Sequence, residues 1–205
     1  MYERYIKRLL DVVISLCSLI VLSPVFLVVA IVIKLGSPGP VIFKQKRYGQ
    51  NKVLFDIYKF RTMRTDAPKD VPTNDLRGAK NFITPLGKFL RKTSLDELPQ
   101  LWNILKGDMS LIGPRPALWN QYDLMELRDQ YGASSIRPGL SGWAQVNGRD
   151  YLSRDLEKKA RRDAEYANNI TFAFDLKCFL LTIVKVFNRQ GIVEGAEEPR
   201  TEARK

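Results

Sequence analysis

Two adjacent carboxylates, Asp96 and Glu97, stand in the part of this sequence whose residue types and spacing best suit phosphate or metal chemistry. They lie within residues 91–116, a stretch that begins with two basic residues and ends in Pro-Arg-Pro. Arg115 is held there between two residues of fixed φ, so its guanidinium loses little entropy on binding a phosphate. The pattern predicts a nucleophilic or metal-binding acid beside a rigid anion receptor.

The acid pair also has a purely structural explanation. Ser94 and Glu97 fit the S-x-x-E capping box of a helix start, and a new helix with Pro99 in its first turn is the alternative. In both cases the acids lie at or beside a helix N-terminus, where the helix dipole favours ionised carboxylates. Taken alone, the two acids fit helix capping better than catalysis.

Further basic residues shift that balance toward a binding site. The cations in segments that resemble turns or loops are Arg91, Lys92, Arg115, Arg137 and Arg149. Two of them again place an arginine beside a rigid or tight turn, in Arg137-Pro138-Gly139 and Gly148-Arg149. Several such arginines around a carboxylate pair indicate a site for a phosphorylated ligand.

Composition limits the chemistry that this site can do. The 205 residues are enough for one domain, or for a domain with an anchor. Lys and Arg outnumber Asp and Glu by 33 to 22, and the net charge of +11 favours an anionic partner. No histidine is present, which removes the usual neutral-pH base and the commonest transition-metal ligand. The basic residues are dispersed and match no nucleic-acid-binding motif, so we expect no nucleic acid partner.

An uncharged apolar run at residues 12–33 predicts contact with a membrane. Ser23-Pro24 breaks the run in its middle, because proline removes a helical hydrogen bond, and the Ser23 hydroxyl could bond a freed backbone group. Basic residues flank both ends, which suits a segment whose two ends stay on the cytoplasmic face. The residues alone leave two alternatives open, a spanning helix and a broken, re-entrant one.

Three charged residues precede that run. Lys7 and Arg8 lie one helical turn before Asp11, so both could pair with it on the helix surface. Together with Ser23 and Pro24, we expect these residues to set the topology of the membrane segment.

After the apolar run, the pattern predicts an α+β fold that is mainly helical. Residues 41–47 and 53–60 are typical of two short strands in a small β-hairpin, followed by a polar loop at residues 65–81. Helices are expected at residues 85–92, after the acid pair, at residues 150–168 and at residues 175–188. The helix at 150–168 carries i,i+4 pairs such as Asp155–Lys159 on its outside. The helix at 175–188 is too short to span a membrane and is either a core or an interfacial helix.

Several motifs give the chain a close resemblance to a known family. They are residues 92–116 (KTSLDELPQLWNILKGDMSLIGPRP), residues 137–149 (RPGLSGWAQVNGR), residues 58–63 (YKFRTM), Lys7-Arg8-x-x-Asp11 and Ser23-Pro24. Together they resemble the bacterial sugar transferase family, most closely its small monotopic phosphoglycosyl transferases, which consist of the catalytic unit alone. The resemblance implies a re-entrant membrane helix at residues 1–36, broken at Ser23-Pro24. It also implies a cytoplasmic, membrane-associated catalytic domain at residues 37–205, with amphipathic helices at the membrane interface and no additional multispan region.

The resemblance also implies a reaction. A UDP-sugar donates its sugar 1-phosphate to polyprenyl (undecaprenyl) phosphate and UMP is released, in the first membrane step of bacterial glycoconjugate assembly. Asp96 attacks the sugar-bearing phosphorus and forms a covalent aspartyl-phosphosugar intermediate. Mg²⁺ is the expected cofactor, with Asp96 and Glu97 at the metal site. The expected phosphate contacts are Arg115, Arg149, Arg91 and Lys59.

The same resemblance places the protein in the bacterial inner (cytoplasmic) membrane, in contact with phospholipid, with its catalytic domain on the cytoplasmic face. The apolar helices leave a homodimer open. A competing interpretation is a non-catalytic, basic peripheral membrane adaptor, but that interpretation gives no purpose to the acid pair and the rigid arginine turns.

Overall fold

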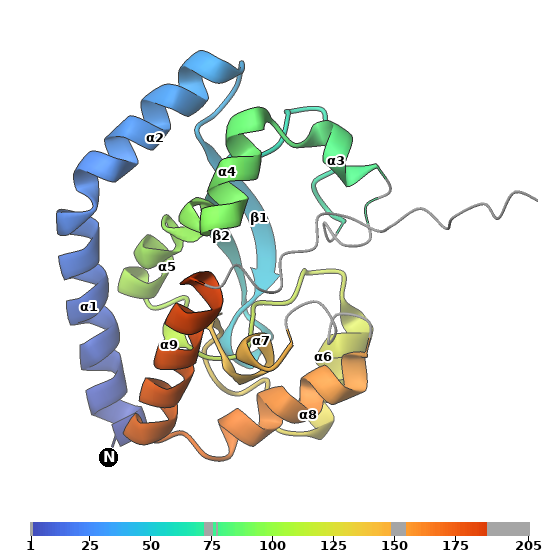
Figure 1. Ribbon diagram of the computed structural model, residues 1–205. Helices are drawn as coiled ribbons and strands as arrows, with labels where there is room; N and C mark the ends of the chain where they lie inside the picture. The colour runs from blue at the N-terminus through green and yellow to red at the C-terminus, as the bar shows by residue number, and fades with distance from the viewer. Residues whose placement is uncertain (1, 72–75, 77, 149–154, 188–205) are drawn as a thin grey trace, which may run out of the picture.

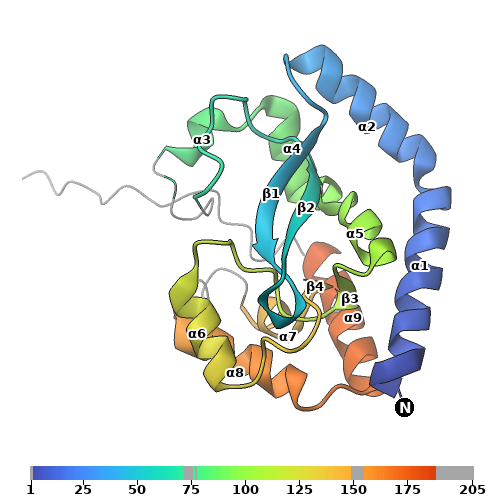
Figure 2. The same cartoon turned by 180° about the vertical axis from the view of Figure 1, so that it is seen from behind.

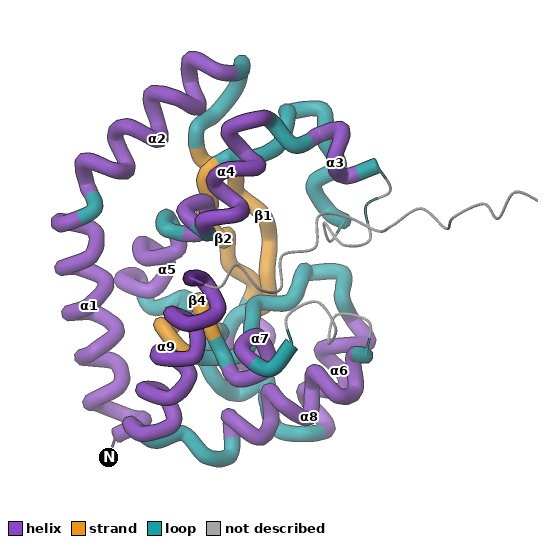
Figure 3. The backbone as a smooth tube through the Cα atoms, viewed as in Figure 1, coloured by secondary structure: helices purple, strands orange, loops and turns teal. Residues whose placement is uncertain are grey.

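Helices make up most of the computed structural model, which describes residues 2–71, 76, 78–148 and 155–187 (Figure 1). The helices are α1 (Lys7–Val21), α2 (Ser23–Gly36), α3 (Ala79–Phe82), α4 (Pro85–Thr93), α5 (Gln100–Lys106), α6 (Tyr122–Gln130), α7 (Trp143–Val146), α8 (Leu156–Ala167) and α9 (Phe172–Phe187). The strands are β1 (Ile42–Tyr48), β2 (Leu54–Phe60), β3 (Ser110–Ile112) and β4 (Gly139–Ser141), and short π- or 3₁₀-helical turns lie at Tyr2–Ile6, Gln50–Lys52 and Leu95–Glu97. The predicted fold, mainly helical with a small antiparallel sheet, is confirmed (Figure 3).

The β-hairpin runs through the middle of the molecule (Figure 2). β1 and β2 are antiparallel, with Ile42 opposite Phe60, so the two predicted strands are confirmed to within one residue at each end. Phe55 and Ile57 of β2 are buried in a cluster with apolar residues of α5 and the segment after it. Burying each such side chain contributes about 1.5–3 kcal/mol, which fixes α5 against the hairpin.

A second, parallel pair of strands was not predicted. β3 and β4 pair Ser110 with Gly139 and Ile112 with Ser141. Each strand has three residues, too few to show an alternating pattern in the sequence. Gly139 is required at this crossing, because a Cβ on it would overlap the backbone nitrogen of Gly113.

The N-terminal arm, α1 and α2, lies along one side of the molecule and bends at the predicted break (Figure 1). The two halves meet at 61°. The Ser23 hydroxyl donates to the Ile20 carbonyl at 2.8 Å, and this is the carbonyl that Pro24, which has no N–H, leaves without its helical donor. Among the described residues no single helix is long and apolar enough to cross a membrane, whereas the bent pair meets that test of length and composition jointly.

Charged residues of α1 dock the arm onto three other elements. Asp11 accepts two hydrogen bonds from β3, at 2.9 and 3.1 Å. Arg8 donates to two carbonyls in the last turn of α5, at 2.6 and 2.9 Å. Lys7 pairs with Asp175 of α9 at 2.7 Å. The predicted local pairing of Asp11 with Lys7 and Arg8 is therefore wrong, because each side chain finds its partner in a different element.

Three of the remaining predicted elements differ from the structure in their limits. The polar segment at residues 65–81 runs into the short helix α3, so its end is not loop. The helix predicted at 150–168 is α8 from Leu156 onward, and residues 150–154 lie outside the described part of the chain. α9 begins three residues earlier than predicted, at Phe172, and residue 188 also lies outside that part.

Candidate active site at the acid pair

The two acids lie on a 3₁₀-helical turn, Leu95–Glu97, between α4 and α5. Ser94 ends α4 in the left-handed conformation, with φ of 57°, and its side chain makes no capping bond to the turn that follows. The capping-box interpretation is therefore wrong, and the alternative, a new helix at Pro99, is closer because Pro99 directly precedes α5. Asp96 and Glu97 are both buried, with exposed fractions of 9% and 8%.

Glu97 joins two cations that are distant in the sequence. Its Oε1 accepts from Lys59 Nζ of β2 at 2.8 Å and from Arg115 Nη2 at 2.8 Å. All three side chains are largely shielded from water, so these ion pairs are screened less than surface pairs. The structure thus brings together four of the predicted residues, the acid pair with Lys59 and Arg115.

The turn that carries Arg115 is held from two sides by other arginines. Arg47 of β1 donates to the Pro116 carbonyl at 3.0 Å. Arg128 of α6 donates to the Arg115 carbonyl at 2.9 Å and forms a buried ion pair with Asp163 of α8 at 2.6 Å. These contacts fix the backbone of the turn, so the Arg115 guanidinium needs little reorganisation to meet an anion.

The cations around Glu97 repel one another and are partly shielded from water. Burial lowers the pKa of Lys59 to about 8, an effect that Glu97 opposes and that Arg115 reinforces. Burial and the neighbouring Arg115 likewise lower the pKa of Arg47 to about 9. Keeping these positive charges together costs free energy, so the cluster favours the binding of an additional anion.

The two other predicted phosphate contacts are Arg91 and Arg149. Arg91, in the last turn of α4, donates from Nε to Thr62 Oγ1 at 2.9 Å and so ties α4 to the segment after β2. Arg149 lies outside the described residues. Arg137, the third arginine beside a rigid turn, donates to the Gly107 carbonyl at 3.0 Å, which gives it a role in the fold.

The acid pair suits a divalent cation whose coordination is completed by oxygens of the substrate. Within the described residues, no three His, Cys, Asp or Glu side chains are grouped so as to hold a metal ion. Mg²⁺ does not need such a cage, since it is usually bound through one or two carboxylates with substrate phosphates and water. Asp96 and Glu97 supply adjacent carboxylates of that type, although Glu97 Oε1 is already shared by two cations.

Sequence reasoning missed Arg47, Arg128 and Asp163. The period of a strand could have found Arg47, because exposed Lys44 and Lys46 alternate with it on the opposite face of β1. No local signal marks Arg128 or Asp163, whose pairing depends on how α6 packs against α8.

Comparison with known proteins gives consistent matches. The family described as "Bacterial sugar transferase" matches residues 2–189. The chain is 40% identical over 191 residues to the UDP-glucose:undecaprenyl-phosphate glucose-1-phosphate transferase of Escherichia coli (strain K12), covering 90% of this chain and 41% of that protein. It is 40% identical over 189 residues to the uncharacterized sugar transferase EpsL of Bacillus subtilis (strain 168), covering 91% of this chain and 90% of that protein.

A third relative has a different sugar in its name. The chain is 39% identical over 187 residues to the UDP-N-acetylgalactosamine-undecaprenyl-phosphate N-acetylgalactosaminephosphotransferase of Aeromonas hydrophila, covering 87% of this chain and 43% of that protein. The chain therefore spans about two fifths of the length of the two relatives named for a UDP-sugar, and about nine tenths of the Bacillus protein.

Proposed function

Because the chain belongs to the bacterial sugar transferase family, we propose that it moves a sugar 1-phosphate from a UDP-sugar to undecaprenyl phosphate and releases UMP. The observation that carries this proposal is the contact of Lys59 and Arg115 with Glu97, directly beside Asp96. A buried carboxylate next to several fixed cations suits chemistry on a phosphate. Two of the relatives are named for the same class of transfer.

In the proposed mechanism Asp96 is the nucleophile. One of its carboxylate oxygens attacks the phosphorus that carries the sugar, a P–O bond to Asp96 forms, and the P–O bond to the leaving UMP breaks. An oxygen of undecaprenyl phosphate then attacks the same phosphorus and breaks the bond to Asp96, which regenerates the carboxylate. Splitting the transfer into two steps lets one site serve two bulky substrates in turn.

The neighbouring residues stabilise charge on the transferred group. We propose that Arg115, Lys59, Arg91 and Arg149 contact phosphate oxygens as negative charge redistributes over them. Glu97 orients Lys59 and Arg115 before the substrate arrives. Mg²⁺, held by Asp96 and Glu97 with the substrate phosphates, would neutralise phosphoryl charge that otherwise repels the nucleophile.

A screen of UDP-sugars tests the proposed function directly. We expect UMP release from at least one UDP-sugar when undecaprenyl phosphate and Mg²⁺ are present, and loss of that release after chelation with EDTA. Omitting the lipid phosphate is the control for hydrolysis. If no UDP-sugar is turned over by folded protein in detergent or in vesicles, the catalytic assignment fails and a non-catalytic membrane adaptor becomes the better explanation.

Exposed apolar side chains support a membrane location. On α1 and α2 they include Leu9, Val13, Leu16, Ile20, Leu27, Val28 and Ile31, and on α9 they include Leu176, Phe179, Leu180, Ile183 and Val184. Soluble monomers rarely expose apolar patches of this extent. We propose that residues 1–36 form a re-entrant arm in the bacterial inner membrane, and that residues 37–205 form the catalytic domain on its cytoplasmic face.

The acid pair lies next to that arm. Leu95 and Leu98, on either side of the two acids, pack against a cluster that contains Val29 and Ile33 of α2. This packing supports a site at the membrane surface, where the phosphate of a membrane lipid is within reach of Asp96.

The re-entrant arm predicts that both termini lie on the cytoplasmic side. A cysteine placed at Tyr5 in a Cys17→Ser background should resist a membrane-impermeant thiol reagent added to intact cells, and react after the cells are opened. A tag at the C-terminus should behave in the same way, and a cysteine in a known periplasmic protein is the positive control. Labelling at Tyr5 in intact cells would instead show a helix that spans the membrane.

A further inference from the structure

Lys159 is a cation near the site that the proposed mechanism does not use. It lies on α8, is half-buried, and is followed by Ala160, which packs against α6. The sequence suggested a pair with Asp155, but the Asp155 carboxylate caps α8 and accepts from the backbone N–H of Lys158 at 2.9 Å. Within the part of the chain that the structure describes, no oxygen accepts a hydrogen bond from the Lys159 ammonium.

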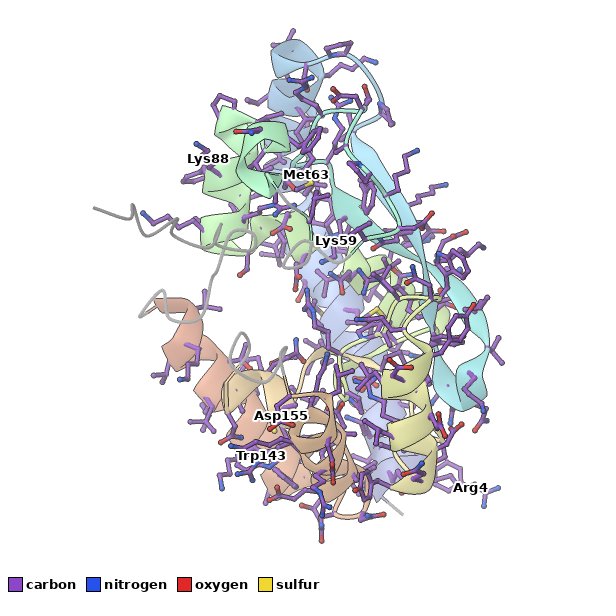
Figure 4. The ribbon with its side chains drawn as sticks, turned by 90° about the vertical axis from the view of Figure 1, so that its right-hand side faces the viewer. Arg4, Lys59, Met63, Lys88, Trp143 and Asp155 are labelled. Atoms are coloured by element: carbon purple, nitrogen blue, oxygen red, sulfur yellow. The ribbon has the colours of Figure 1, made fainter. Side chains whose placement is uncertain are left out.

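The face of α8 that carries Lys159 is connected through one ion pair to the turn that carries Arg115. Asp163 lies one helical turn after Lys159 on the same face of α8. It forms the buried ion pair with Arg128 at 2.6 Å, and Arg128 also donates to the Arg115 carbonyl at 2.9 Å. One guanidinium therefore ties the face of α8 that carries Lys159 to the turn that carries the anion receptor. In Figure 4, the label Asp155 marks the start of α8, and the label Lys59 marks the part of β2 whose lysine shares Glu97 with Arg115.

The electrostatic surroundings of Lys159 lack a sufficient counter-charge. Burial and the neighbouring Arg128 lower the pKa of Lys159 to about 8, with smaller contributions from Arg115 and Arg47. Asp163 acts in the opposite sense, but its carboxylate is already bound to Arg128. An ammonium held among guanidiniums in a partly desolvated position costs free energy unless an anion neutralises them. A phosphate between Lys159 and Arg115 would remove that cost.

We propose that Lys159 donates a hydrogen bond to a phosphate oxygen of a substrate, as a contact from α8 additional to Lys59 and Arg115. This inference deepens the proposed function and rests on it. A sugar nucleotide carries two linked phosphates, whereas Lys59 and Arg115 meet at a single carboxylate beside Asp96. The oxyanion at Lys159 belongs either to the nucleotide phosphate that leaves as UMP or to the head group of undecaprenyl phosphate.

A structural role for Lys159 predicts a different outcome. A lysine that packs its methylene chain on the protein and keeps its ammonium in water contributes through that chain. Lys159→Met retains most of the apolar stem and removes the ammonium, so it separates the two roles. Lys158→Met, which removes an exposed charge from the neighbouring position of α8, is the matched control.

The test measures binding and turnover on the full chain in detergent. Isothermal titration calorimetry with UMP gives the nucleotide affinity without turnover, and steady-state assays give KM for undecaprenyl phosphate. Because a hydrogen bond to a charged group corresponds to about a 10- to 100-fold change in affinity, we expect Lys159→Met to raise either the Kd for UMP or the KM for undecaprenyl phosphate by that factor. A higher Kd for UMP assigns Lys159 to the nucleotide phosphate. A higher KM for undecaprenyl phosphate assigns it to the lipid phosphate.

Different results would contradict the role of Lys159 and the proposed reaction. Lys159→Met with both constants unchanged, an unchanged melting temperature and wild-type turnover would overturn the role of Lys159 and leave the reaction intact. A wild-type protein that turns over no UDP-sugar, yet binds UMP in a manner that depends on Lys159, would overturn the reaction and keep the phosphate contact. If Lys159→Met unfolds, Lys159→Gln supplies the measurement, because it also removes the positive charge and keeps a polar end, and it should change the same constant in the same direction.

Discussion

Replacing Asp96 by Asn is expected to abolish turnover. An amide is a far poorer nucleophile than a carboxylate, so the covalent step has no substitute group, and loss of a nucleophile typically costs at least ~10⁴-fold in rate. The two side chains have nearly the same volume, so the buried turn at Asp96 should keep its shape. Release of UMP from the preferred UDP-sugar is the first measurement.

Intact-protein mass spectrometry is the second measurement for this variant. Wild-type protein incubated with UDP-sugar in the absence of lipid acceptor should gain the mass of one phosphosugar, and Asp96→Asn should not. Asp129→Asn, which alters an exposed acid that pairs with Lys52, should behave as wild type. Normal turnover or a normal adduct in the Asp96 variant would show that another group is the nucleophile.

Replacing Arg115 by Met is expected to lower kcat/KM by about 10²–10³-fold, which is the usual effect of removing one preorganised donor to a developing oxyanion. In this structure Arg115 shares Glu97 Oε1 with Lys59, and in the proposed mechanism it also contacts a substrate phosphate. Its backbone carbonyl remains bound to Arg128 after the substitution, so the turn itself should persist. Steady-state kinetics with varied UDP-sugar give the measurement, and the melting temperature shows whether the fold is kept.

Arg115→Lys distinguishes the guanidinium fork from the charge. Lysine keeps the positive charge but loses the paired donors, so we expect only partial recovery relative to Arg115→Met. Arg161→Met is the matched control, because Arg161 forms an exposed pair with Glu157 on the outside of α8 and such pairs contribute little. If Arg115→Met retains wild-type kcat/KM, Arg115 is a structural partner of Glu97 and the anion receptor must be placed elsewhere.

The elements of this fold that carry their own local signal were predictable. The hairpin follows from two alternating segments around a turn, and α4 follows from Pro85 after the capping Thr84, whose side chain accepts from Gly87 N–H. The break in the N-terminal arm follows from Pro24, since the loss of one N–H is a property of the residue itself. The limits of these elements differ from prediction by only one or a few residues.

The partners of charged side chains were not predictable in the same way. Lys7, Arg8 and Asp11 have helical spacing that allows them to pair, yet each bonds to a different element. A surface pair on a helix contributes only about 0.2–0.5 kcal/mol, whereas a bond that satisfies a buried polar group avoids a cost of about 1–3 kcal/mol. Tertiary docking therefore decided these contacts.

The sequence by itself determined which chemistry is available: an adjacent acid pair, an arginine fixed between prolines, no histidine, and an apolar segment with a break. These features depend on residue type and on neighbours in the sequence, so they can be recognised without knowledge of the fold. Only the tertiary structure decided that Lys59 and Arg115 meet at Glu97, and that the Arg128–Asp163 ion pair ties α8 to the turn that carries Arg115. Those contacts join residues far apart in the chain, and the packing of β2, α6 and α8, rather than any local pattern, sets the distances between them.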